Sequence, residues 1–328
     1  MSQQLTRWGI LGTGRIAREF AQGLTSVPDA KLVAVGSRTQ SSADAFADHF
    51  QVPNRHATYE ALAADHEVDA IYISTPHPMH CENTLLCLAA GKHVLCEKPF
   101  AINADQAQTM IDAARRHKLF LMEAMWSRFL PSTRAMLEVI SSGQIGEARL
   151  LQADFGFHAE FNPAGRLFNP ALGGGALLDV GVYPISLASM IFGSPDRATG
   201  DAHIGISGVD EQSAVVLHHA GGQLAVLHAA ISLETAQEAV LYGSEGHIYM
   251  QPPWWKCPKV SVVRPGRSEE IIEIPIAGNG YNYQAIEVGR CLREGLVESP
   301  IMPLDETLSI MKTMDGLRKQ WGLKYPME

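Results

Sequence analysis

The sequence has little positive charge. Its 26 Lys and Arg residues are outnumbered by 35 Asp and Glu residues, which gives a formal net charge of −9. The basic residues do not gather into the cluster that a phosphate-binding face requires. We therefore expect no nucleic acid among the main partners.

Cysteines and long apolar runs are also scarce. The five cysteines have no CxxC spacing, so we expect reduced and mostly buried thiols. His77, His80 and Cys81 lie close in sequence, but no second group with ligand spacing completes a site, and we expect no metal. Residues 1–7 lack the apolar stretch of a secretory signal, and no apolar run approaches the length of a membrane span. These absences predict a cytoplasmic protein without a membrane partner.

The chain is long enough for two domains, because it has 328 residues of which 46% are hydrophobic. In residues 1–123, strand candidates alternate with helical patterns. This alternation predicts an α/β domain of the Rossmann type, with a doubly wound parallel sheet. The strand candidates are 7–11, 31–36, 69–74, 93–96 and 119–122.

The pattern changes in residues 124–328, which we expect to form an α+β domain. A long strand candidate at 149–157 is followed by pairs of strands that fit three hairpins within 215–274. Hairpins in series predict a large, mostly antiparallel sheet with an open face. Helices at 283–294 and 305–321 are expected to cover part of that sheet.

A glycine-rich loop follows the first strand candidate. It reads G-x-G-x-x-A from Gly12 to Ala17 and opens a helical pattern. Gly12 allows a tight turn, Gly14 lets the backbone approach a pyrophosphate, and Ala17 keeps helix and strand close. The loop predicts dinucleotide binding, as opposed to a strand-to-helix turn without a ligand. Its candidate contacts are Gly12, Thr13, Gly14, Arg15 and Ile16.

The end of the second strand indicates which dinucleotide binds. NAD enzymes usually place an acid there to bind the ribose 2′-hydroxyl. This chain has Ser37, Arg38 and Thr39, and no acid before Asp44. Because Arg38 can pair with a 2′-phosphate and both hydroxyls can donate to it, we expect NADP(H) rather than NAD(H).

A charged pair and a proline end the strand at 93–96. The sequence Glu97-Lys98-Pro99 places Lys98 where ligands bind in open α/β sheets, beyond the carboxyl ends of the strands. Taken alone, such a lysine is more often solvated at the surface. We interpret Lys98 as catalytic because the segments around it supply a cofactor loop and candidate partners.

The segment Gly173–Pro184 supplies those partners. Three glycines precede a helical pattern that carries Asp179 and Tyr183, four residues apart. On an α-helix this spacing puts both side chains on one face, although Pro184 can displace the start of the helix. A capping aspartate and a core tyrosine are the alternative interpretation.

Taken together, these motifs resemble the glucose–fructose oxidoreductase, inositol dehydrogenase and rhizopine-catabolism family (Gfo/Idh/MocA). The resemblance is based on the order and spacing of Gly12–Ala17, Thr75-Pro76 with His80, Glu97–Pro99 and Gly173–Tyr183. Many members carry His where this chain has Tyr183, and the tyrosine form is typical of branches that act on dihydrodiols and on glucose and fructose. The resemblance implies an NADP-dependent homodimer, joined through its open sheets, with a cis peptide bond at Lys98–Pro99.

The resemblance also implies site residues and an activity. Cofactor contacts extend to Thr75, Pro76, His80, Glu97 and Lys98. Trp126, Phe155 and either Trp254 or Trp255 are expected to wall a substrate pocket. The implied activity is hydride transfer between a sugar or vicinal (dihydro)diol and the nicotinamide.

In that reaction we expect Tyr183 to act as the general acid/base. Because a free tyrosine has a pKa near 10, the cation of Lys98 would favour its phenolate. Asp179 would hold Lys98 or the substrate hydroxyl in place. An NADP(H)-binding sensor without catalysis is the alternative function, although such relatives tend to lose one of the three residues.

Overall fold

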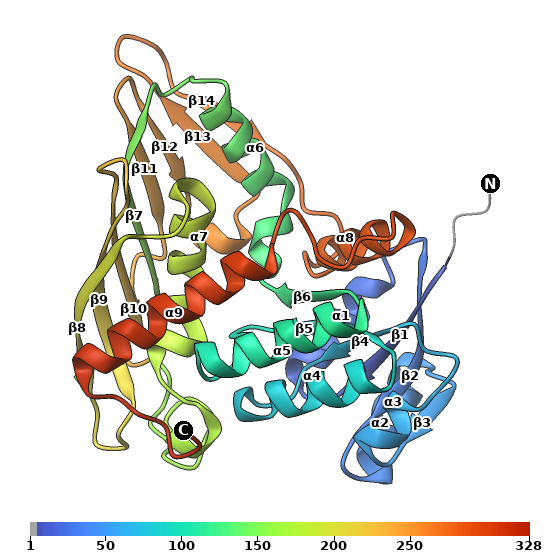
Figure 1. Cartoon of the computed structure of the whole chain (residues 1–328). Coiled ribbons are helices and arrows are strands. Elements are labelled where there is room, and N and C mark those ends of the chain that lie inside the picture. The colour runs from blue at the N-terminus through green and yellow to red at the C-terminus, as the bar shows by residue number, and fades with distance from the viewer. Residues whose placement is uncertain (1–4) are drawn as a thin grey trace. The chain divides into compact units, whose positions relative to one another are not determined.

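The computed structural model describes residues 5–328 and groups them into two compact units. One unit comprises the residues up to Trp126 together with Ala277–Thr307, and the other comprises Ser127–Ile276 and Leu308–Glu328. This grouping differs from the continuous ranges 1–123 and 124–328, because the chain returns to the first unit at 277–307. The ribbon of Figure 1 follows this path by colour.

The first unit contains a parallel six-stranded sheet in the order β3-β2-β1-β4-β5-β6, so the predicted doubly wound α/β fold is confirmed. Its strands are β1 (Thr6–Leu11), β2 (Ala30–Gly36), β3 (Asn54–His56), β4 (Ala70–Ile73), β5 (His93–Glu97) and β6 (Leu121–Ala124). Its helices are α1 (Arg15–Leu24), α2 (Gln40–Phe50), α3 (Tyr59–Ala63), α4 (His80–Ala89), α5 (Ala104–His117) and α8 (Asn282–Arg293). Asn103 caps α5, accepting a 2.9 Å hydrogen bond from the Gln106 N–H.

The strand register brings three loops to the same edge of this sheet. Leu11 of β1 pairs with Ile73 of β4, which in turn pairs with Cys96 of β5. The residues that follow these strands therefore lie next to one another beyond the carboxyl ends. Ligands of open α/β sheets bind at this edge.

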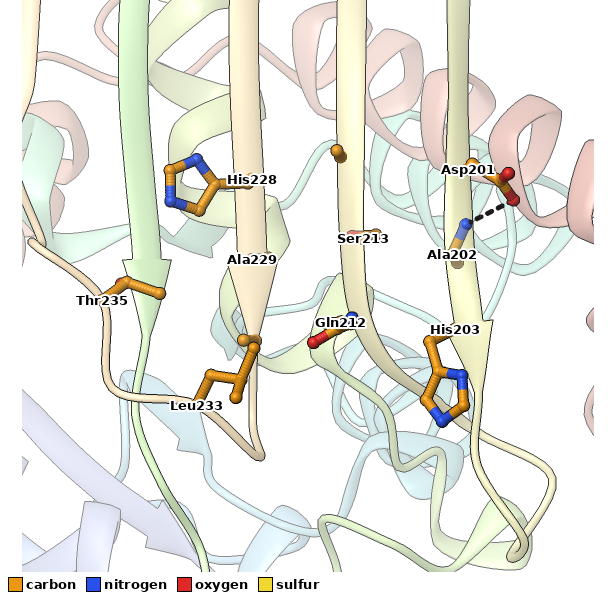
Figure 2. A pocket seen from close by; sticks show the side chains of 11 residues that line it. Asp201, Ala202, His203, Gln212, Ser213, His228, Ala229, Leu233 and Thr235 are labelled. Atoms are coloured by element: carbon orange, nitrogen blue, oxygen red, sulfur yellow. Dashed lines mark hydrogen bonds between the residues drawn. The ribbon is translucent and has the colours of Figure 1, made fainter.

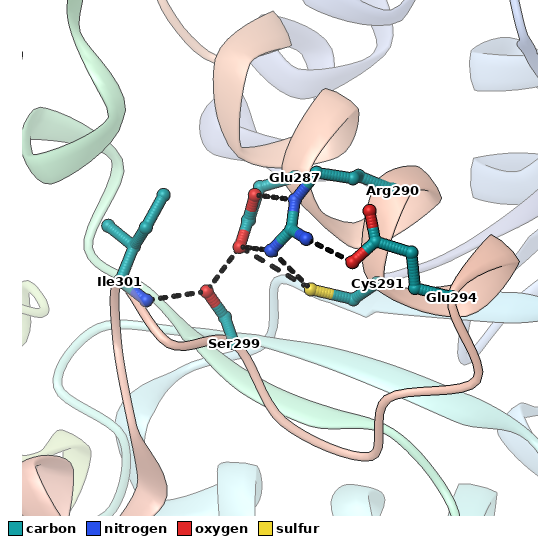
Figure 3. Close-up of polar contacts among 6 residues, drawn as sticks. All are labelled: Glu287, Arg290, Cys291, Glu294, Ser299 and Ile301. Carbon is teal, nitrogen blue, oxygen red and sulfur yellow. Dashed lines mark hydrogen bonds and ion pairs between the residues drawn. The ribbon is translucent and has the colours of Figure 1, made fainter.

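Helix α8, which the sequence analysis expected to cover part of the antiparallel sheet, belongs to the first unit. Asn279 donates a 2.7 Å hydrogen bond to the Glu19 carbonyl of α1, and Arg293 forms an ion pair with Asp29. Figure 3 shows how the helix is tied to the segment after it: the buried Glu287 carboxylate accepts a 2.6 Å hydrogen bond from Ser299 Oγ. Arg290 donates to the same carboxylate. These long-range polar contacts, which hydropathy patterns do not reveal, fix the helix.

The second unit contains an eight-stranded sheet in the order β14-β13-β12-β11-β7-β10-β9-β8. The three predicted hairpins are present, and β7 pairs with β10 in parallel, which confirms a large, mostly antiparallel sheet. The strands are β7 (Ala148–Gly156), β8 (Arg197–Ile204), β9 (Asp210–His218), β10 (Leu224–Ala230), β11 (Ala239–Gly243), β12 (His247–Met250), β13 (Lys259–Val263) and β14 (Glu270–Glu273). The helices are α6 (Pro131–Ser141), α7 (Val182–Phe192) and α9 (Leu304–Trp321), of which the part from Leu308 belongs to this unit.

The two faces of this sheet differ in exposure. On one face, Ala225 and Leu227 of β10 are buried, and α7 packs against this strand. On the other face, the register aligns three valines and one glutamine across the sheet, in the order Val216, Val226, Gln152 and Val240, and we call this the valine row. Val226 is 41% exposed, so we call this second side the open face.

Two expectations from composition have different outcomes. Four of the five cysteines are buried and the fifth, Cys81, is partly buried, so the prediction of buried free thiols is confirmed. In contrast, the helical segment Pro170–Phe192 is long and apolar enough to cross a membrane, contrary to the expectation that no run approaches that length. Most of this segment is buried inside the second unit (83%), as in the core helix of a globular protein.

Candidate functional site

The glycine-rich loop has the geometry of an anion-binding turn. Gly12 has φ +105°, and a Cβ there would lie 2.8 Å from Ser74 Oγ, so the turn requires glycine. A Cβ on Gly14 would meet nothing within 4 Å, which leaves open space at the start of α1. Helix α1 has no side-chain cap and no acidic residue in its first turn, and Ala17 is fully buried against the sheet. The loop therefore fits a pyrophosphate at a helix N-terminus.

The three residues that follow β2 differ in their exposure and in their hydrogen bonds. Ser37 is buried, and its hydroxyl lies 3.4 Å from Thr13 Oγ1. Arg38 is exposed. The Thr39 hydroxyl caps α2, accepting a hydrogen bond from the Ser42 N–H at 3.3 Å. Arg38 thus offers a charge for a 2′-phosphate, while the contribution of the two hydroxyls stays a prediction.

His80 connects the two loops that follow β4 and β5. Its ring is fully buried, with Nε2 2.9 Å from the Thr75 carbonyl oxygen and Nδ1 2.8 Å from the Pro99 carbonyl oxygen. Burial lowers the pKa of His80, and the nearby Lys98 cation also lowers it, against the opposing effect of the two carbonyls. His80 thereby joins the loop after β4 to the backbone that directly follows Lys98 at the carboxyl edge.

Glu97 and Lys98 differ in their surroundings. The Glu97 carboxylate is buried and accepts a hydrogen bond from the Tyr72 hydroxyl, which makes it part of the sheet edge. Lys98 is partly exposed. The peptide bond between Lys98 and Pro99 is cis, which confirms the expectation drawn from the resemblance. Lys98 therefore projects from the edge that the glycine-rich loop shares.

In the second unit, Asp179 and Tyr183 lie on one continuous helical segment. The turn Leu177–Gly181 is a π-helix, in which the Val182 N–H bonds to the Leu177 carbonyl, and α7 follows. This wide turn accommodates Pro184, which has no N–H to donate to the preceding turn. The ideal α-helical offset expected between Asp179 and Tyr183 therefore does not apply. Both residues are nevertheless buried, with 4% and 6% exposure.

Aromatic rings surround Tyr183. Its ring centroid lies 5.2 Å from that of Phe155, and Phe155 stacks on Trp255 with centroids 3.3 Å apart. Trp254 is buried, and its indole N–H donates a 2.7 Å hydrogen bond to the Asp154 carbonyl. Of the two tryptophans left open by the sequence, Trp255 is thus the one near Tyr183, with ring centroids 6.4 Å apart.

Trp126, the remaining predicted pocket residue, belongs to the first unit. Its indole stacks on Tyr281, with ring centroids 4.6 Å apart. The sequence analysis did not single out Tyr281. A glycine on each side of Asn279, before Tyr281, was the signal of a tight turn there.

Arg166 is a charged neighbour of Asp179 that the sequence analysis missed. Its Nη1 lies 2.8 Å from Asp179 Oδ1 and its Nη2 lies 3.3 Å from Oδ2, a bidentate ion pair. Burial lowers the pKa of the Arg166 guanidinium, but the negative charges of Asp179 and of an ionised Tyr183 more than offset this, so the pKa is raised. No motif marks this arginine, because its partner lies beyond a loop.

A second buried carboxyl holds the start of the helical segment that carries Tyr183. Asp210 is fully buried and accepts a 2.6 Å hydrogen bond from the Leu177 N–H. Gly175, with φ +114°, leaves room for this carboxyl, because a Cβ there would lie 2.1 Å from Asp210 Oδ1. Next to it, the Tyr325 hydroxyl donates a 2.6 Å hydrogen bond to the Gly174 carbonyl. The glycines of the motif thus serve close packing within this unit.

Burial raises the pKa of Asp210 from 3.8 to about 7, against the opposing effect of its hydrogen bonds. The folded state therefore binds more protons than the unfolded state between these values, and stability falls as pH rises from about 4 to 7. The cost of ionisation is on the order of 4 kcal/mol, at about 1.4 kcal/mol per pKa unit. We expect Asp210→Asn, which retains an acceptor for the Leu177 N–H, to unfold several degrees higher than wild type at pH 8 and with a smaller difference at pH 5.

Thermal unfolding followed by circular dichroism checks this expectation. Asp201→Asn is the matched control, because Asp201 is exposed on β8 of the same sheet. Parallel curves of Tm against pH for wild type and Asp210→Asn would contradict the assignment.

Comparison with known proteins places these two units in one family. Residues 6–125 match the model of the Gfo/Idh/MocA oxidoreductase family, NAD-binding Rossmann fold, and residues 133–249 match the model of the Gfo/Idh/MocA C-terminal domain. The chain is 39% identical to mouse trans-1,2-dihydrobenzene-1,2-diol dehydrogenase and 36% identical to the human enzyme, in each case over 98% of both chains.

Solved structures agree with this placement. One is KijD10, a 3-ketoreductase from Actinomadura kijaniata in complex with NADP and TDP-benzene. It superposes with a TM-score of 0.85 at 27% identity, covering 96% of this chain and 98% of that one. The chain therefore belongs to the Gfo/Idh/MocA family of oxidoreductases.

Proposed function

We propose that this protein uses NADP to transfer hydride between a hydroxyl-bearing carbon of a sugar or vicinal (dihydro)diol and the nicotinamide. Tyr183 serves as the general acid/base, assisted by Lys98 and Asp179. The observation that carries the proposal is the surroundings of Tyr183: a buried phenol beside a carboxylate–guanidinium pair and two stacked aromatic rings. The diol dehydrogenases and the ketoreductase among the relatives act on substrates of matching chemistry.

Two features of the first unit and one relative support NADP. The Gly12–Ala17 loop offers an uncapped helix start with open space at Gly14. Arg38 is exposed directly after Ser37 at the end of β2, and no acid lies between β2 and Asp44. KijD10, a relative at 27% identity, was solved with NADP. A 2′-phosphate would pair with Arg38, whereas a carboxylate at this position would repel it.

The protein residues must move a proton and hold the substrate, since bound NADP supplies the hydride acceptor. During oxidation, the Tyr183 phenolate takes the proton from the substrate hydroxyl, and during reduction the phenol returns it to the carbonyl oxygen. A cation is needed because the free phenol has a pKa near 10. We assign this role to Lys98. Asp179 holds the reacting hydroxyl in line with Tyr183, and the faces of Phe155 and Trp255 line the substrate.

The test is an assay of NADP⁺ reduction over trans-dihydrodiols, D-xylose, D-glucose and inositols, repeated with NAD⁺. We expect turnover on at least one sugar or diol and a higher kcat/KM for NADP⁺ than for NAD⁺. A higher kcat/KM with NAD⁺ would contradict the cofactor assignment. Tight NADPH binding without turnover of any compound in the panel would favour a sensor instead of an enzyme.

We also propose a homodimer joined through the open face of the eight-stranded sheet. The valine row continues into Tyr249 of β12, and a groove on this sheet runs over β8, β9 and β10 (Figure 2). His228 and Leu233 at this groove are 51% and 49% exposed. The groove lies on the opposite side of β10 from α7, so it is not the site around Tyr183.

A charge placed in the middle of the valine row would separate the dimer, because apolar surface is buried in such interfaces. We expect wild type to have twice the 35.7 kDa chain mass in light scattering, and Val226→Arg to have the mass of one chain. Leu5→Arg is the control, since Leu5 is 43% exposed in the other unit. A wild-type mass of one chain at micromolar concentration would contradict the proposal.

A further inference from the structure

The ion pair between Arg166 and Asp179 is asymmetric in exposure. The Asp179 side chain is 6% exposed, whereas that of Arg166 is 52% exposed. A surface arginine usually contributes little through an ion pair, because water screens it. Here the guanidinium reaches a buried carboxylate with two parallel hydrogen bonds, an arrangement that fixes the plane of both groups.

The backbone around Arg166 is held in place by the glycine motif. A Cβ on Gly174 would lie 2.6 Å from the Leu167 carbonyl oxygen and 2.9 Å from that of Arg166, so only glycine permits this approach. The Gly175 N–H donates a 2.8 Å hydrogen bond to the Leu167 carbonyl. Phe168 is buried in a cluster with Val180. The loop that carries the guanidinium is therefore fixed against the helical segment that carries Asp179 and Tyr183.

The charged residues near Tyr183 in the second unit can be named one by one. Arg166 interacts electrostatically with both Asp179 and Tyr183, and the negative charge of each raises the pKa of the guanidinium. The same interaction favours the ionised form of Tyr183. On the strands that pack against this segment, the other titratable or charged groups are Arg149, Asp154, Asp210, Glu211, His218 and His228. Arg128, which contacts Ser186, and Lys256, next to Trp255, lie on neighbouring segments. Arg128 donates a hydrogen bond to the Ser186 carbonyl. The Asp210 carboxyl accepts one from the Leu177 N–H, and its charged neighbour is Arg318.

We infer that Arg166 is a positioning residue: it fixes the Asp179 carboxylate and supplies a second positive charge that favours the Tyr183 phenolate. The inference rests on the proposed function, because it takes Tyr183 to be the acid/base residue. Arg166 is then a cation in the same unit as Tyr183, in addition to Lys98 of the other unit. It also explains why a half-exposed arginine makes a bidentate contact with a buried aspartate.

The experiment compares wild type with Arg166→Met and Arg166→Lys in three measurements. We expect Arg166→Met to lower kcat at least about tenfold, with the NADPH dissociation constant unchanged within about twofold. The inflection of kcat against pH should move up by about one unit, as expected when a neighbouring cation is lost. Arg166→Lys keeps the positive charge but lacks the planar guanidinium that makes two parallel hydrogen bonds to Asp179. It should therefore return the inflection toward wild type and recover kcat only in part.

A titration without turnover separates this inference from the proposed function. The difference in absorbance at 295 nm between each protein and its Tyr183→Phe counterpart gives the titration of Tyr183 itself, and its midpoint should rise in Arg166→Met. Arg149→Met is the control, because Arg149 forms an exposed ion pair with Glu147 at 2.9 Å. An unshifted Tyr183 midpoint in a folded Arg166→Met protein would overturn the inference. Absence of wild-type turnover would instead overturn the proposed function.

Discussion

Replacing Tyr183 with Phe is expected to lower kcat roughly 10²–10⁴-fold, the usual effect of removing a general acid/base. The substitution deletes one hydroxyl and keeps the ring. The contacts with Phe155 and Trp255 should therefore persist, and the substrate KM should change little. The loss should appear in kcat, because the proton transfer takes place only in the transition state.

Steady-state kinetics at several pH values measure this effect. Tyr242→Phe is the matched control, since Tyr242 is 37% exposed on β11 and loses the same hydroxyl. The variant should also lose the pH inflection that Tyr183 gives to wild type. If Tyr183→Phe kept kcat within a few-fold of wild type, the proton would have to come from another group, and the proposed role of Tyr183 would be wrong.

Replacing Lys98 with Met is expected to have the second-largest effect, a loss of at least roughly 10²-fold in kcat. Methionine retains an unbranched side chain of similar length, and the Pro99 carbonyl that follows it stays in contact with the His80 ring. The loss is therefore electrostatic: without the ammonium, the phenolate of Tyr183 is disfavoured near neutral pH. Activity should recover in part as pH rises.

NADPH fluorescence titrations and thermal unfolding accompany these assays. Lys31→Met is the control, because Lys31 is exposed at the start of β2, the opposite end of that strand from the cofactor loop. If Lys98→Met left kcat unchanged, or raised only the dissociation constant for NADPH, the role of Lys98 would be limited to cofactor binding.

Local sequence signals predicted the first unit well. Strands and helices alternate with the spacing of a parallel sheet, so the positions of Gly12, Thr75 and Lys98 after β1, β4 and β5 could be inferred before any coordinates. The exception is β3, which has three residues, follows Pro53 and carries only polar side chains. Its pairing with β2 depends on backbone hydrogen bonds that no hydrophobic pattern reveals.

In the second unit, several features of the candidate site could not be predicted from the sequence. The spacing of Asp179 and Tyr183 suggested one helical face, but Pro184 selects a π-helical turn whose existence depends on the surrounding packing. Trp254 and Trp255 are neighbours with identical side chains, and only the contact of one with Asp154 and of the other with Phe155 distinguishes them. Arg166 meets Asp179 through a loop closure that depends on Gly174.

The hydrogen bond from Tyr325 to the Gly174 carbonyl has a practical consequence for handling the protein. Proteolytic trimming during purification usually removes exposed chain ends first. Loss of the last four residues would remove Tyr325 and also the Glu328 carboxylate that pairs with Arg318. Because Gly174 lies beside the backbone of Arg166, we expect such trimming to displace the loop that carries Arg166 without touching Tyr183. Preparations should therefore be checked by mass spectrometry for the presence of residues 325–328 before kcat values are compared.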